Sequence, residues 1–186
     1  MEPIVWGYLS PWAEKKSMTP AINARLDKLL TPYYRSLMKT GRIIVPAHGW
    51  YEWTGEKGNK QPWYIKAKDG KPLFFAALTN RDPGKPDQED AGFVIVTEAA
   101  AGGMVDVHAR RPLVLSAEDA RLWMDPGISY EQAEQIARTH AIGEEAFEWQ
   151  MVGRDVNKVS RHDAGLIEPI RVEPAGPSLK RQQKAS

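Results

Sequence analysis

Short runs of β-branched and aromatic residues, separated by Gly, Pro or Asp, dominate the middle of the chain. They occupy residues 43–45, 50–53, 63–66, 73–78 and 93–97. Runs of this composition and length are typical of β-strands. Asp69 and Gly70 stand between the third and the fourth run, and an Asp-Gly pair between two strands favours a tight hairpin. This part of the chain is therefore predicted to form a sheet.

Helical patterns are fewer. Residues 32–38 form one short candidate, residues 116–124 open with Ser-Ala-Glu-Asp, and residues 130–140 follow Ser129. A Ser with acidic residues behind it is typical of a helix N-terminus. Residues 147–152 indicate a further strand. The order of elements predicts an α+β fold, an antiparallel or mixed sheet with peripheral helices, because the regular strand–helix alternation of a doubly wound fold is missing.

Two segments differ from the rest in composition. Residues 82–92 form a polar stretch rich in Pro, Gly and acidic residues, and residues 171–186 have almost no large apolar residue. The first is predicted to be a loop and the second a disordered basic tail. We therefore expect a single domain over residues 1–170, a length that suits one hydrophobic core.

The composition excludes several kinds of site. The chain has 186 residues and no cysteine, so disulfides, thiolate metal sites and a cysteine nucleophile are excluded within it. No apolar run reaches the roughly 18–20 residues that span a bilayer, and the first residues do not follow the pattern of a secretory signal. On this basis we expect a cytoplasmic protein.

Charge is distributed unevenly, although the net charge is only +1. Residues 1–82 hold 13 Lys/Arg and 7 Asp/Glu, a net of +6, residues 83–170 hold 8 and 16, a net of −8, and residues 171–186 hold 4 and 1, a net of +3. Five of the seven tryptophans lie in the basic part. Basic and aromatic side chains together are typical of sites for single-stranded nucleic acid. An ordinary solvated surface around a core rich in tryptophan accounts for the same residues.

Two motifs in the basic part carry side chains suited to chemistry. Asn23 offers a donor and an acceptor, and Arg25 offers a planar fork that fits phosphate, although a loop Asn beside a surface Arg would look the same. Glu52 shares one face of a predicted strand with Trp50. If that face is buried, the pKa of Glu52 is raised and the carboxyl suits acid–base chemistry. If it faces water, Glu52 is an ordinary surface residue.

A third motif places His108 shortly before Arg110, Arg111 and Pro112. An imidazole exchanges protons near neutral pH, and the two arginines could hold a phosphate; a basic surface turn is the alternative. The four histidines show no metal-ligand spacing, and neither a P-loop nor a dinucleotide-binding motif is present. We expect neither a metal nor a cofactor.

The motifs together resemble one family. Seven of them occur in the order seen in the SRAP family of SOS-response-associated peptidase-like, abasic-site processing proteins. In this sequence they read Trp6-Gly7-Tyr8 with Pro11-Trp12, Ile22-Asn23-Ala24-Arg25, Gly49-Trp50-Tyr51-Glu52-Trp53, Lys60-Gln61-Pro62-Trp63, residues 92–97, Asp106-Val107-His108 with Arg110-Arg111-Pro112, and Leu166-Ile167-Glu168-Pro169. Each motif is short, but seven in order make a specific signal over nearly the whole chain.

The resemblance implies a β-rich, barrel-like α+β fold and a cleft for single-stranded DNA that contains abasic sites. At such a site the sugar has lost its base and opens to an aldehyde. Family members trap this aldehyde as a thiazolidine, using the α-amine and thiol of an N-terminal cysteine, in the response to DNA damage. The resemblance implies no metal and no membrane partner, and a monomer. The implied catalytic residues are Asn23, Glu52 and His108, and the implied DNA contacts are Trp12, Arg25 and Arg110.

The sequence departs from the family pattern at its start. Family members begin with Met-Cys-Gly-Arg and a long segment before the Trp-Gly motif, whereas this sequence begins with Met1-Glu2-Pro3. We therefore expect that the cysteine-bearing segment and the early strands are missing, which would leave apolar sheet edges exposed. A shortened gene model or fragment, a degenerate copy of phage or other mobile-element origin, and a site completed by another polypeptide each account for this start.

Two functional hypotheses remain. The first is abasic-site processing on single-stranded DNA, in a family whose activities are classed as hydrolase, peptidase and lyase. The second is a non-catalytic module that binds single-stranded DNA and has lost the crosslinking nucleophile. The sequence leaves open whether this chain is an enzyme.

Overall fold

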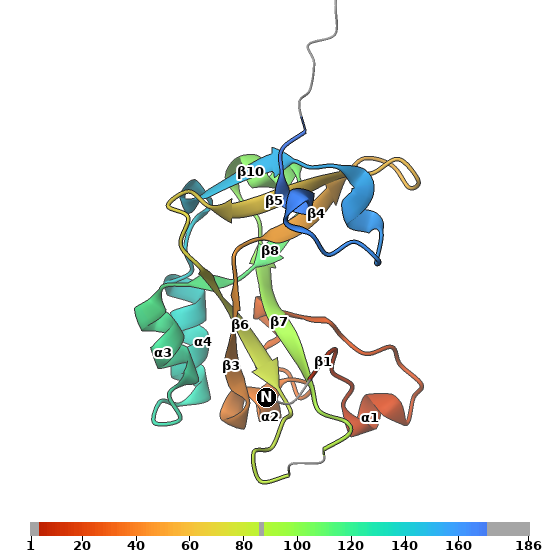
Figure 1. Ribbon diagram of the computed structural model, residues 1–186. Helices are drawn as coiled ribbons and strands as arrows, with labels where there is room; N and C mark the ends of the chain where they lie inside the picture. The colour runs from red at the N-terminus through yellow and green to blue at the C-terminus, as the bar shows by residue number, and fades with distance from the viewer. Residues whose placement is uncertain (1–3, 86–87, 171–186) are drawn as a thin grey trace, which may run out of the picture.

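The computed structural model describes residues 4–85 and 88–170. Within these residues the strands form two sheets, one of seven strands and one of three (Figure 1). The larger sheet contains β1 (Val5–Trp6), β2 (Asn23–Arg25), β3 (Arg42–Ala47), β6 (Leu73–Thr79), β7 (Gly92–Ala99), β8 (Arg110–Pro112) and β9 (Val114–Leu115). The smaller sheet contains β4 (Trp50–Thr54), β5 (Gln61–Ala67) and β10 (Phe147–Met151).

The helices are short. The α-helices are α1 (Pro11–Glu14), α2 (Arg35–Thr40), α3 (Ala117–Met124) and α4 (Tyr130–Thr139), and single 3₁₀ turns occur at η1 (Leu26–Lys28), η2 (Gly102–Asp106), η3 (Glu144–Ala146), η4 (Arg154–Asn157) and η5 (Ala164–Ile167). Helices α3 and α4 lie side by side, α3 packs on β3 and β6, and α4 contacts α2 and α3; the smaller sheet lies across the top of the view (Figure 1). No helix in the two described segments is long and apolar enough to cross a membrane.

Strand β7 organises the larger sheet. It pairs antiparallel with β6 and β8, and parallel with β1 and β2, which makes this sheet mixed. Asn23 is registered with Ile95. Gly92 permits the close approach of β1, because a Cβ atom at this position would lie 1.9 Å from the carbonyl oxygen of Gly7. These pairings place β2 and β8, which carry candidate site residues, beside the same strand.

The hydrophobic core has two parts, one on each face of the larger sheet. The first part packs the sheet on α2, α3 and α4 and contains Leu78, Val94, Val96 and Trp123 among other buried residues. The second lies between the two sheets and contains Trp50, Phe75, Ile95 and Phe147. Successive residues of a strand point to opposite faces, so β6 and β7 supply side chains to both parts. Burying a side chain of this size stabilises the fold by about 1.5–3 kcal/mol, and the second part holds the two sheets together.

Most of the longer predicted elements are confirmed. Strands are found at all six predicted positions, and α3 and α4 agree with the predicted helices within a residue or two. Ser116 and Ser129 cap these helices by accepting from the backbone N–H groups of Asp119 and Gln132, at 3.0 and 3.2 Å. Helix α2 begins at Arg35 rather than at residue 32. The residues before it form turns, in which the Tyr34 N–H donates to the Thr31 carbonyl oxygen at 3.1 Å.

Two fold predictions are wrong. The turn at Gly70 exists, with φ +70° and a hydrogen bond from the Gly70 N–H to the Ala67 carbonyl oxygen. The flanking strands do not form a hairpin, however, because β5 pairs with β4 and β10 whereas β6 pairs with β3, β7 and β9. The turn carries the chain from one sheet to the other. The barrel-like sheet is also not found, since the pairings of the described residues give two open sheets. The predicted tail, 171–186, lies outside the described residues.

Candidate functional site

A cavity of about 750 Å³ lies between the two sheets. The larger sheet contributes residues from β2, β3, β6, β7 and β8, and the smaller sheet contributes β4. Part of the lining is the apolar core between the sheets, with Trp50, Phe75 and Ile95. Polar groups from distant parts of the sequence also line it, namely Asn23, Arg25, Glu52, Thr97, His108, Arg110 and Arg111. An apolar cavity with a few converging polar groups is the usual form of a binding site.

Glu52 and His108 meet in this cavity. The Nδ1 atom of His108 lies 3.8 Å from Oε2 of Glu52, and the two side chains are 49% and 18% exposed, respectively. Glu52 shares the strand face of the buried Trp50, so the interpretation of this face as buried is confirmed. Burial raises the pKa of the Glu52 carboxyl, while the neighbouring His108 and Trp50 side chains act in the opposite direction. A carboxyl that gains a proton more readily, next to an imidazole, forms a pair able to exchange protons.

The backbone of the His108 segment is fixed by local contacts. Nδ1 of His108 lies 2.7 Å from the carbonyl oxygen of Arg110 and 3.1 Å from the Arg110 backbone nitrogen, so the backbone of Arg110 offers this ring nitrogen both an acceptor and a donor. Nη2 of Arg110 donates to the carbonyl oxygen and the hydroxyl of Thr97 at 2.6 and 3.0 Å. Burial, followed by the charge of Arg25, lowers the pKa of the Arg110 guanidinium.

Strand β2 brings Asn23 and Arg25 to the other side of the cavity. Its backbone is held by parallel pairing with β7 and by the Tyr34 hydroxyl, which donates to the Asn23 carbonyl oxygen at 3.2 Å. The Arg25 guanidinium donates two hydrogen bonds of 2.9 Å to the Asp27 carboxylate. Arg25 and Arg110 therefore put two positive charges on the wall of one cavity, the arrangement suited to a phosphate.

Trp12 does not line this cavity. It lies on α1 with 57% of its surface exposed, and it lines a separate cavity of about 700 Å³ together with Tyr8 and Tyr33. Nζ of Lys16 stands 4.4 Å from the centre of one of its rings. The structure thus brings five of the six predicted site residues together and places the sixth elsewhere.

Trp6 is a cavity residue that was not singled out from the sequence. It is 53% exposed, its indole N–H donates to the Ile22 carbonyl oxygen at 2.8 Å, and its ring is stacked on Phe93 at 6.3 Å. Its presence in the Trp-Gly motif beside a basic segment was the available signal. An exposed aromatic ring held in one orientation suits stacking against a base.

Arg110 and Arg111 are not equivalent, although the sequence places them side by side. The side chain of Arg111 is 4% exposed and forms ion pairs with Glu98 and Glu144, at 2.8 and 3.0 Å. It also donates to the Ile142 carbonyl oxygen at 2.6 Å. With two carboxylates beside it, Arg111 links β7 and β8 to the chain entering the smaller sheet. Arg111 is therefore already paired with two carboxylates, and the expectation that the two arginines hold a phosphate stays a prediction.

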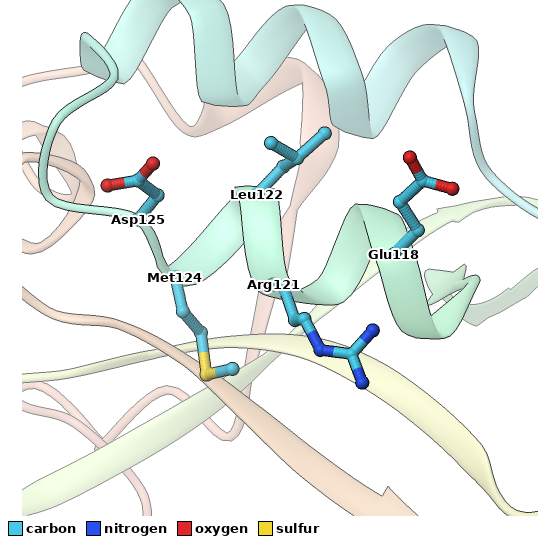
Figure 2. Close-up of a pocket in the computed structure, with 5 residues that line it drawn as sticks. All are labelled: Glu118, Arg121, Leu122, Met124 and Asp125. Carbon is cyan, nitrogen blue, oxygen red and sulfur yellow. The ribbon is translucent and has the colours of Figure 1, made fainter.

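A hollow elsewhere in the molecule lacks converging polar groups. A hollow of about 500 Å³ lies along α3. Figure 2 shows that the Glu118 and Leu122 side chains beside it point away from those of Arg121 and Met124, so the polar groups do not converge. In the part of the chain that the structure describes, no three His, Cys, Asp or Glu side chains are grouped so that they could hold a metal ion.

The chain is similar to known proteins. Residues 1–159 match the family model described as SOS response associated peptidase (SRAP). The chain is 42% identical over 171 residues to the abasic site processing protein YedK of Escherichia coli, covering 91% of this chain and 75% of the relative. It is 33% identical over 127 residues to the abasic site processing protein YoqW of Bacillus subtilis, where it spans 55% of the relative and the match covers 65% of this chain.

Two solved structures have the same fold. A phage-related protein from Bordetella bronchiseptica is 41% identical, with a TM-score of 0.69 over 81% of this chain and 70% of that one. A protein from Bacteroides thetaiotaomicron is 25% identical, with a TM-score of 0.73 over 89% and 75%. From the family match and these similarities, the chain belongs to the SRAP family.

Proposed function

We propose that the cavity between the sheets binds single-stranded DNA at an abasic site, and that Glu52 and His108 move protons there. The observation that carries this proposal is the meeting of these two side chains, 3.8 Å apart, in a cavity that also holds Asn23 and two arginines. The relatives from E. coli and B. subtilis are named as abasic site processing proteins, which supports the choice of substrate. The protein is proposed to act as a monomer of one domain.

The side chains suit the chemistry of an opened abasic sugar. When an amine of the protein, its α-amine or a lysine, adds to the aldehyde carbon, the carbonyl oxygen leaves as water and a Schiff base forms. The nitrogen gives up its protons and the departing oxygen gains them. Glu52, with its raised pKa, can supply a proton, and His108 can accept one. The Asn23 amide can donate to the oxygen that develops charge, and Arg25 and Arg110 can contact the flanking phosphates. The 186 residues contain no cysteine, so they supply no thiol to close a thiazolidine.

The test uses a single-stranded oligonucleotide with one abasic site, followed by denaturing gel electrophoresis. With borohydride we expect a trapped protein–DNA band, because the reductant converts a Schiff base into a stable amine. Glu52→Gln and His108→Ala should slow trapping about 100-fold or more, the range for a lost acid or base. Glu148→Gln is the matched control, since this exposed glutamate on β10 pairs with Lys66 outside the cavity.

Two results would contradict this scheme. A band that persists without borohydride would show a stable crosslink, which an unreduced Schiff base does not explain. If the wild-type chain neither binds the oligonucleotide nor gives a trapped band, the abasic-site proposal is wrong.

A second candidate is a module that binds single-stranded DNA without catalysis. It is favoured by the exposure of Arg25 and Trp6 on the cavity lining, a combination that holds backbone and bases. In this case binding weakens with salt, Arg25→Ala lowers the affinity, Glu52→Gln leaves it unchanged, and no band is trapped. Equal losses from both substitutions would argue against a purely electrostatic binder.

A further inference from the structure

The Asp27 carboxylate is bound to the guanidinium N–H groups of Arg25 with which a phosphate would form hydrogen bonds. It lies in η1, directly after β2, and its two carboxylate oxygens accept from Nε and Nη2 of Arg25, each at 2.9 Å. Two parallel N–H···O bonds from one guanidinium are also the geometry in which arginine binds a phosphate. Arg25 lines the cavity between the sheets. An arginine of the cavity lining therefore already holds an anion of the protein itself.

The charges around this pair form one cluster. Burial and the charge of Arg25 lower the pKa of Arg110, whereas the charge of Asp27 acts in the opposite direction. The hydrogen bond from Arg25 holds the pKa of the Asp27 carboxyl below its usual range, so Asp27 is ionised at neutral pH. Arg25 and Arg110 line the cavity, and Asp27 is bound to Arg25, so a phosphate that approaches the Arg25 guanidinium must compete with the Asp27 carboxylate.

The ion pair between Arg25 and Asp27 is exposed, so breaking it costs little. The side chains of Arg25 and Asp27 are 57% and 47% exposed, and an exposed ion pair of this kind contributes little to folding stability. Exchanging one carboxylate for one phosphate keeps both N–H groups of the guanidinium paired.

We propose that Asp27 acts as an internal phosphate mimic, which holds the Arg25 fork in the free protein and is displaced when a phosphate of single-stranded DNA binds. This inference rests on the proposed function, because it takes the cavity as the DNA site. Asp27 is then a determinant of affinity rather than a catalytic residue. It weakens binding to DNA that offers only its backbone, and so favours strands that gain further contacts in the cavity.

The test measures binding of a fluorescein-labelled oligothymidylate without an abasic site, by fluorescence anisotropy at low and moderate salt. Asp27→Asn should bind about two- to fivefold more tightly, the range for an exposed ion pair that no longer competes. Asp163→Asn is a matched control. Its carboxylate accepts from Nε of Arg161 at 2.8 Å with the same spacing along the chain, it also loses one negative charge, and neither residue lines the cavity. This control should leave the affinity unchanged.

A double variant decides whether the effect passes through the Arg25 fork. In an Arg25→Ala background, Asp27→Asn should give little or no gain, because the group for which phosphate and carboxylate compete is absent. An undiminished gain, or an equal gain from Asp163→Asn, would show a general charge effect and overturn the proposal. Weaker binding by Asp27→Asn would show that Asp27 supports Arg25 in its DNA-binding position, and would also overturn it.

The two proposals can fail separately. If the wild-type chain binds the oligonucleotide and Asp27→Asn binds it no more tightly, only the role of Asp27 is wrong. If neither the wild type nor the variant binds, the cavity is not a DNA site and both proposals are wrong. Thermal melting of each variant, expected to match the wild type because the pair is exposed, confirms that the comparison is between folded proteins.

Discussion

Arg42 holds the C-terminal ends of two helices together, and its replacement by methionine tests whether this contact stabilises the fold. The residue is 9% exposed. Its guanidinium donates to the carbonyl oxygens of Met38 at the end of α2, and of Trp123 and Asp125 at the end of α3, at 2.5, 2.7 and 2.5 Å. The last carbonyl groups of a helix have no partner within the helix, and a positive charge there is favourable.

The magnitude follows from these bonds. A hydrogen bond from a charged donor contributes about 1.5–3 kcal/mol, so three such bonds give about 4.5–9 kcal/mol before the cost of burying the guanidinium is subtracted. Methionine keeps most of the apolar stem but supplies no donor. We expect Arg42→Met to lower the free energy of unfolding by about 3–5 kcal/mol, a large part of the roughly 5–15 kcal/mol of a typical domain.

Urea denaturation followed by circular dichroism measures this loss. Arg121→Met is a suitable control, because Arg121 lies on the exposed side of α3 and makes one long bond of 3.4 Å to the Ala117 carbonyl oxygen; its effect should stay within about 0.5 kcal/mol. A loss below about 1 kcal/mol for Arg42→Met would refute the reasoning, because the helix ends would then be satisfied equally well without the guanidinium.

Three further predictions concern single positions. Gly49→Ala should destabilise the smaller sheet and abolish DNA binding, measured by melting and anisotropy, because a Cβ atom would lie 2.3 Å from the Ile65 carbonyl oxygen and 2.6 Å from the Tyr64 ring; an unchanged melting temperature would contradict this. Asp119→Asn should reduce stability at pH 7 and have less effect near pH 2. The Ser116 and His140 hydrogen bonds lower the pKa of Asp119 in the folded state, so its stabilisation is present above the ordinary carboxyl pKa of about 3.9 and lost as the pH falls through the lower folded value; equal effects at both pH values would disprove the linkage. Ser129→Ala should cost about 1 kcal/mol in urea denaturation, since the bond from the Gln132 N–H to the Ser129 hydroxyl is lost, while the residue 129 N–H can still donate to the Gln132 side chain; Ser160→Ala, outside the helices, should not.

The sequence was most informative where elements were long enough to show a pattern. Strand β6 has seven residues and helix α4 has ten. Elements of this length are identified by the spacing of their apolar residues or by their capping residues. Strands β1, β2, β8 and β9 contain only two or three residues, too few to show a period of two. Their extended conformation depends on pairing with β6 or β7, which for β1, β2 and β9 lie far away in sequence. Long-range pairing also explains why the predicted hairpin of β5 with β6 is wrong. Strand β6 is buried on both faces and pairs with β3, β7 and β9 instead.

The sequence identified most residues of the candidate site, but not how their side chains lie relative to one another. Short motifs identified Asn23, Glu52 and His108, and the structure places all three on one cavity. Trp12 was assigned to the same set but lies on α1, beside Tyr8 and Tyr33. The different environments of Arg110 and Arg111 depend on Glu98 and Glu144, which nothing in the local sequence connects with them. Burial and ion pairing are properties of the folded chain, so residue type alone could not separate these arginines.

The parallel pairing of β2 with β7 has a consequence for how the protein folds. Asn23 is registered with Ile95, and Arg25 with Thr97, so the chain must close a long loop before this edge of the sheet can form. Non-local parallel pairing is intrinsically slow. We therefore expect the cavity to be assembled late on the folding pathway, after the shorter-range β4–β5 and β6–β7 pairs, and the intermediate that precedes it to expose the apolar surface of Trp50 and Phe75. Newly made chains would then be most prone to aggregate at the moment when the binding site is still open.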